Sequence, residues 1–147
     1  MHYAGVTEAD LAGDLVVHAA RLVRAVRRDL ELPAGTRILS LLDEHGTLGV
    51  TTLADLDRSS QPTMSGAVAQ LVELGWVTKS PNPADARGAL VALTDVGRTE
   101  LRRIRRSIGD HVAALVANHP HLTTEDLGTA VAVLEALVST SLEKGTS

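Results

Sequence analysis

The segment from Leu53 to Gly97 constrains the fold more than any other part of the chain, because its breaks fix the order of its elements. A short helix is predicted over about 51–57, ending at Arg58-Ser59-Ser60. Ser59 and Ser60 are predicted to supply the N-cap of the next helix. A second helix opens at Pro62, whose missing N–H would have had no partner in a first helical turn. Gly75 stops that helix. Two strands follow, Val77–Lys79 and Ala89–Leu93.

Two helices followed by a two-stranded ribbon predict a mainly α-helical chain with a small β-wing, a winged helix-turn-helix. In that fold the second helix lies in the DNA major groove and the ribbon lies beside it. The first helix is predicted to bury Leu53, Ala54 and Leu56. The buried face of the second is apolar and consists of Met64, Ala67, Val68, Leu71 and Leu74.

The opposite face of the second helix is predicted to contact DNA. Its residues are small or polar, namely Gln61, Thr63, Ser65, Gly66 and Gln70. Small polar side chains near a helix N-terminus can reach phosphates and base edges, and the helix dipole favours an anion there. A solvated polar face without a partner is the alternative interpretation.

The connection between the strands, Ser80–Gly88, is predicted to be an exposed loop too long for a tight hairpin. Within it Asp85 would brace the loop and leave the Arg87 guanidinium pointing outward. An exposed arginine suits the narrow, electronegative minor groove of A/T-rich DNA. Lys79, on the preceding strand, would contact a phosphate. A local surface ion pair between Asp85 and Arg87 remains the alternative.

Long amphipathic helices are predicted at both ends of the chain. Thr7 with Asp10 begins the first, which runs to about Leu30, and Thr123 with Asp126 begins the last. The apolar seams are Leu11, Leu15, His18, Leu22 and Val26 in the first, and Leu127, Val131, Leu134, Val138 and Leu142 in the last.

Two further helices lie between these ends, over about 34–44 and, after a Thr94 cap, over about 95–118, the latter with Leu101, Ile104, Ile108, Val112 and Leu115 on one stripe. The terminal seams could pack within one subunit. A slim central unit offers them little core, however, so a two-fold dimer is favoured. The chain is therefore predicted to be a single domain, with residues 1–33 and 95–147 for dimerisation and residues 34–94 as the DNA-binding lobe.

Five short motifs occur in register over the 45 residues from position 53 to 97. They are Leu53-Ala54, Pro62-Thr63-Met64-Ser65, Gly75-Trp76-Val77, Asp85-Ala86-Arg87 and Leu93-Thr94-Asp95-Val96-Gly97. The pattern resembles the MarR family of bacterial transcription regulators. The resemblance implies a homodimer with interleaved terminal helices that grips palindromic double-stranded DNA, usually as a repressor. It also implies release by a small anionic or phenolic effector bound between the dimer helices and the DNA lobe.

Gly66 departs from this pattern, because many family members carry arginine there. A glycine inside a helix costs roughly 1 kcal/mol relative to alanine. The segment from Leu53 to Gly97 is also poor in cations, and the whole chain has a net charge of −4. Weak or unusually selective DNA binding is expected. Either Gly66 allows close backbone approach to DNA or affinity has been lost, and a winged-helix protein-interaction module with weak or lost DNA binding is the rival function.

Several other functions are not favoured. The absence of cysteine excludes disulfides and thiolate metal sites. His111, His119 and His121 are expected to be solvated rather than metal ligands. No motif of a nucleophile elbow, P-loop or dinucleotide site occurs, so an enzyme or a bound cofactor is not expected. Neither a signal peptide nor a membrane span is predicted, which favours the cytoplasm. With one Trp, one Tyr and no Phe, a regulator without a phenolic effector stays open.

Overall fold

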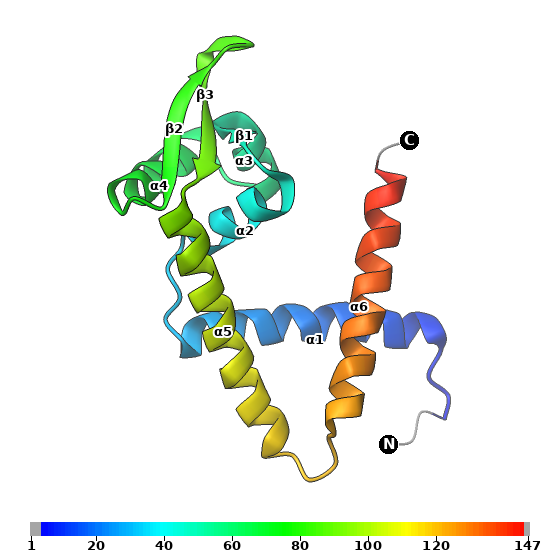
Figure 1. Cartoon of the computed structure of the whole chain (residues 1–147). Coiled ribbons are helices and arrows are strands. Elements are labelled where there is room, and N and C mark those ends of the chain that lie inside the picture. The colour runs from blue at the N-terminus through cyan, green and yellow to red at the C-terminus, as the bar shows by residue number, and fades with distance from the viewer. Residues whose placement is uncertain (1–3, 146–147) are drawn as a thin grey trace. The chain divides into compact units, whose positions relative to one another are not determined.

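The computed structural model describes residues 4–145, except for the side chains of residues 86 and 87. Its elements follow in the order α1 (Glu8–Asp29), α2 (Thr36–His45), β1 (Leu48–Gly49), α3 (Val50–Asp57), α4 (Gln61–Glu73), β2 (Val77–Asn82), β3 (Asp85–Leu93), α5 (Asp95–Ala117) and α6 (Thr124–Lys144) (Figure 1). The chain divides into two compact units between Ile108 and Gly109, inside α5.

Helix starts follow the predicted capping chemistry. Thr7 and Thr123 each form a complete capping box with the aspartate three residues later. Ser60 caps α4 by accepting a hydrogen bond from the Thr63 N–H. The adjacent Ser59 does not share this role, because its Oγ is buried and has no hydrogen-bond partner among the described residues. Local side-chain chemistry therefore fixes where these three helices begin.

One small sheet forms the wing. Its three strands are antiparallel in the order β1-β3-β2, with Leu48 opposite Val91 and Val77 opposite Leu93. The prediction of a long open loop from Ser80 to Gly88 is wrong, because strand pairing continues to Asn82 opposite Asp85. β2 is an edge strand and tolerates a proline, and a register irregularity follows directly after that proline. The wing is consequently a long ribbon with a short turn (Figure 1).

The core of the first unit is aliphatic and lies between α2, α3, α4, the sheet and the start of α5. Its most deeply buried side chains are Leu39, Leu53, Met64, Val68, Val91 and Ile104. The predicted inward positions Leu53 and Ala54 are confirmed, but Leu56 is 39% exposed because it lies in the last turn of α3. Leu74 is 55% exposed because α4 ends one residue earlier and the chain turns at Gly75.

Apolar seams on the long helices are largely exposed in the single chain. On α1 Val26 is buried, whereas Leu11 and Leu22 are 40% and 46% exposed. The described part of α6 has no buried residue, and its predicted seam positions are between 38% and 55% exposed. On α5 the stripe begins buried at Leu101 and Ile104, and it is already 42% exposed at Leu115, so Leu115 is not core within one chain. None of the helices in residues 4–145 combines the length and the hydropathy needed to cross a bilayer.

Candidate nucleic-acid interface

Helix α4 exposes the polar face that its periodicity predicted. Met64, Val68 and Leu71 are buried on the opposite side and hold the helix against the core. The exposed positions include every residue predicted to contact DNA from this helix, namely Gln61, Thr63, Ser65, Gly66 and Gln70. Their exposure is thus confirmed, and DNA contact by them remains a prediction.

Two of these side chains already have partners in the free protein. Gln61 Nε2 donates a hydrogen bond of 2.8 Å to Thr51 Oγ1, which ties the start of α4 to the start of α3. Thr63 Oγ1 accepts a bond of 2.8 Å from Ser60 Oγ. An accepting hydroxyl keeps its own proton, so Thr63 can still donate to a phosphate or a base edge. Gln61 keeps its carbonyl oxygen for a further contact.

A shallow hollow of about 160 Å³ lies between α3, α4 and the wing. Its lining consists of Val50, Thr51, Gln61, Ser65, Lys79, Gly88 and Ala89. The fold thereby brings together three predicted site residues, Gln61, Ser65 and Lys79, that come from a helix and a strand. Thr63, Gly66 and Gln70 do not line this hollow.

The wing carries the remaining predicted residues. Lys79 is exposed on β2, opposite Val91. Asp85 begins β3 opposite Asn82, and the Asn82 side chain accepts a hydrogen bond of 3.0 Å from the Ala84 N–H, which closes the turn. Arg87 belongs to β3 and not to an open loop, which corrects the prediction. The side chain of Arg87 lies outside the described residues, and with it the proposed Asp85 brace.

The turn between α3 and α4 contains a cation to which the sequence reasoning gave no role. Arg58 ends α3 in a left-handed conformation, with φ of 56°, and its N–H bonds to the carbonyl oxygens of Ala54 and Asp55. Its side chain is exposed. A positive charge two residues before the Ser60 cap suits a phosphate near the α4 N-terminus. The break at Arg58-Ser59-Ser60 marked the turn, but a left-handed arginine is uncommon and no sequence signal pointed to it.

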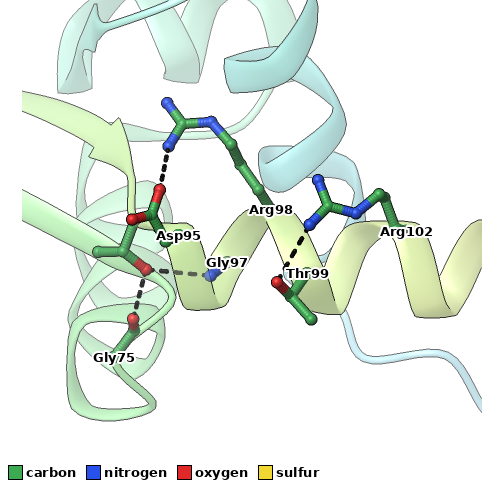
Figure 2. Close-up of polar contacts among 7 residues, drawn as sticks. Gly75, Asp95, Gly97, Arg98, Thr99 and Arg102 are labelled. Atoms are coloured by element: carbon green, nitrogen blue, oxygen red, sulfur yellow. Dashed lines mark hydrogen bonds and ion pairs between the residues drawn. The ribbon is translucent and has the colours of Figure 1, made fainter.

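Two contacts connect elements that flank α4. Before α4 begins, Arg37 on α2 forms a 2.7 Å ion pair with Asp57, the last residue of α3. After its end, Thr94 Oγ1 donates a 2.6 Å hydrogen bond to the Gly75 carbonyl oxygen and accepts a 3.0 Å bond from the Gly97 N–H (Figure 2). The ion pair therefore links α2 to α3, and Thr94 links the turn after α4 to the start of α5.

No cluster of three or more histidine, aspartate or glutamate side chains suited to a metal ion occurs in the described part of the chain. His119 and His121 are exposed at the break between α5 and α6.

Comparison with known proteins identifies the family. Residues 33–88 match the model of the MarR family. The chain is 30% identical over 139 residues to the HTH-type transcriptional regulator Mb0904 of Mycobacterium bovis. The alignment covers 92% of this chain and 97% of the relative. The chain belongs to the MarR family. A second relative, the HTH-type transcriptional regulator ML2140 of Mycobacterium leprae, is 32% identical over 105 residues, or 69% of this chain and 73% of the relative.

Solved structures confirm the winged helix-turn-helix fold predicted for this MarR-family chain. Wild-type MarR of E. coli in its apo form is similar with a TM-score of 0.67 at 23% identity, over 90% of this chain and 96% of that one. A mutant MarR of E. coli complexed with operator DNA is similar with a TM-score of 0.55 at 24% identity, over 88% and 91% of the two chains.

Proposed function

We propose that this MarR-family transcriptional regulator is a homodimeric repressor that binds a palindromic double-stranded DNA site. The observation that carries the proposal is the exposed polar face of α4, which lies beside a wing strand bearing Lys79. A helix of this kind fits the major groove, and a ribbon beside it reaches the flanking groove. The E. coli protein of the same fold, crystallised with operator DNA, supports this mode of binding.

Each residue of the interface has a role that follows from its chemistry. Thr63, Ser65, Gln61 and Gln70 would read or anchor in the major groove, since hydroxyls and amides can bond base edges. Arg87, oriented by Asp85, would enter the minor groove. Lys79 would contact a phosphate, and Arg58 would contact another near the start of α4.

The homodimer is supported by the exposed seams of α1 and α6. A soluble protein seldom leaves apolar stripes of this length in water, so a second copy would cover them. Residues 1–33 and 95–147 would form the two-fold interface, and residues 34–94 would form each DNA-binding lobe. Two-fold symmetry matches a palindrome whose half-sites lie about one helical turn apart.

A small anionic effector is supported by a cavity of about 300 Å³ between the end of α1, α2 and α4. Its lining includes Arg27, the Arg37–Asp57 ion pair and the unpartnered Ser59 hydroxyl, next to apolar Ile38 and Met64. The Arg27 cation, the Ser59 hydroxyl and an apolar wall together suit a carboxylate or a phenol. An occupant would touch α4 directly and could change its orientation. We further propose that the protein acts in the cytoplasm, where bacterial DNA lies, and that it has no catalytic activity.

The rival function is a protein-interaction module that has lost DNA affinity. Two features favour it. One is Gly66, and the other is that the segment from Leu53 to Gly97 contains more acidic residues than its three cations, Arg58, Lys79 and Arg87. Salt titration on fragments selected from the host genome separates the two functions. A regulator binds one selected fragment more tightly than a scrambled fragment, and its affinity falls steeply with salt. Negligible binding to every genomic fragment at moderate salt favours the module.

A further inference from the structure

Gly66 lies at the centre of the exposed face of α4. With about 3.6 residues per turn, its neighbours on that face are Pro62, Thr63, Ala69 and Gln70. The buried residues Met64, Val68 and Leu71 lie on the opposite side of the helix. The glycine is therefore placed where α4 would come closest to a nucleic acid.

The fold itself does not require glycine at this position. Gly66 is not among the glycines with positive φ, and a Cβ built on it would meet no other atom within 4 Å. Gly97 is different, since its Cβ would lie 2.0 Å from the Trp76 carbonyl oxygen. Glycine is also less favourable than alanine inside a helix. The packing of this chain therefore gives no reason for a glycine at position 66.

The outward surface of α4 around Gly66 has a low profile. Pro62, Gly66 and Ala69 all lack a long side chain, whereas Gln70 and, one turn further on, Glu73 carry long side chains on this face. An α-helix with side chains has a diameter of about 10–12 Å, close to the roughly 12 Å width of the major groove. A helix without outward side chains at its centre can lie deeper in that groove. Its backbone can then contact base edges directly.

We propose that Gly66 determines DNA sequence specificity, because its missing side chain lets the α4 backbone lie against base edges in the major groove. The inference rests on the proposed function. A backbone contact at Gly66 differs from a contact made by an arginine side chain, which would reach a guanine or a phosphate from a greater distance. With a backbone in contact, the shape of the base edges at that position decides which sequences fit. Selectivity then does not depend on a cation at this position.

The test compares Gly66→Ala with Gly109→Ala, a matched substitution at an exposed helical glycine whose Cβ would also meet nothing within 4 Å. Each variant is measured for its thermal midpoint and for its affinity to a selected genomic operator and to scrambled DNA. Both substitutions should raise the midpoint by roughly 2–4 °C. Gly66→Ala should weaken operator binding by roughly tenfold and leave binding to scrambled DNA unchanged, and Gly109→Ala serves as the reference for the stability change alone.

A second variant, Gly66→Arg, adds a cation at the same point. It should strengthen binding to scrambled DNA and reduce the ratio of operator affinity to scrambled affinity.

Three results would overturn the inference while the proposed function stands. They are unchanged operator affinity in Gly66→Ala, an equal loss of affinity for operator and scrambled DNA, and a lowered thermal midpoint, which would mean that the fold needs the glycine. A wild-type protein that prefers no genomic fragment over scrambled DNA would overturn both the inference and the proposed function.

Discussion

Thr94 Oγ1 donates a hydrogen bond of 2.6 Å to the carbonyl oxygen of Gly75, and so links the start of α5 to the residue where the chain leaves α4. The same oxygen accepts a bond from the Gly97 N–H and caps α5. The backbone adds a second link, since the Thr94 N–H bonds to the Trp76 carbonyl oxygen at 3.1 Å. One side chain therefore links the turn after α4 to the helix that continues toward the C-terminal unit.

Replacing Thr94 with valine should lower the free energy of unfolding by about 1–2 kcal/mol, because a cap and a hydrogen bond to Gly75 are lost at nearly constant shape. Thr94→Ser keeps the hydroxyl and should lose much less. Urea unfolding of both variants measures the difference. Equal stability of Thr94→Val and Thr94→Ser would contradict a role for the hydroxyl.

Gly97→Ala should destabilise the protein by about 1–3 kcal/mol, although alanine is the better helix former. The reason is steric, because the added Cβ would lie 2.0 Å from the Trp76 carbonyl oxygen, which is backbone and cannot turn away. Gly109→Ala on the same helix has open space and should stabilise the protein by about 0.5–1 kcal/mol. Thermal unfolding that moves both variants in the same direction would show that the α5 start is less tightly packed than described.

Arg58→Gly should remove a DNA contact without harming the fold. Glycine adopts a φ of 56° readily, so the turn between α3 and α4 keeps its shape while the charge is lost. The slope of log affinity against log salt should decrease by about 0.9 for each phosphate contact removed. An unchanged slope, at unchanged stability, would exclude Arg58 from the interface.

Arg87→Ala and Lys79→Ala should weaken DNA binding in different ways. Loss of Arg87 should cost about 1–3 kcal/mol on the operator and relax the sequence preference at the flanking minor groove. Loss of Lys79 should weaken binding almost uniformly across sequences and reduce the salt slope by about 1. Electrophoretic mobility shifts at several salt concentrations, with operator and scrambled DNA, distinguish the two effects. Unchanged operator affinity in Arg87→Ala would remove the wing from the account.

The capping box of α1 should make stability depend on acid pH. Hydrogen bonds from the backbone N–H and the side chain of Thr7 hold the pKa of the Asp10 carboxyl below its ordinary value. A lowered pKa means that the folded chain favours the carboxylate, so the stabilisation is present above the ordinary pKa and is lost as pH falls through the lowered one. Asp10→Asn should therefore be less stable than wild type at pH 7, and the gap in stability should narrow as pH falls below about 4. Thermal unfolding from pH 7 to pH 3 would contradict the expectation if the gap stayed constant.

Local chemistry made much of this fold predictable from sequence. The side chains of the caps Thr7, Ser60 and Thr123 each accept a hydrogen bond from the backbone N–H three residues later. A short local motif is therefore enough to locate these helix starts. The buried face of α4 followed from helical spacing for the same reason. The prediction that Leu74 is buried was wrong, because periodicity alone does not tell where a helix ends.

Features that depend on distant partners could not be predicted. The wing ribbon continues past Pro81 because β2 is an edge strand, and strand order is set by the whole sheet. The bond from Gln61 to Thr51 depends on how α3 and α4 cross. For α4, sequence therefore predicted which side chains are exposed but not which of them already have partners.

The most direct test of a dimeric DNA-binding regulator is the mass of the free protein together with the stoichiometry of its complex with DNA. Sedimentation equilibrium at micromolar concentration should give a particle of twice the 15.5 kDa chain mass. On a selected genomic fragment that particle should bind as one dimer per palindromic site. A particle of 15.5 kDa that binds selected and scrambled fragments alike would contradict the account.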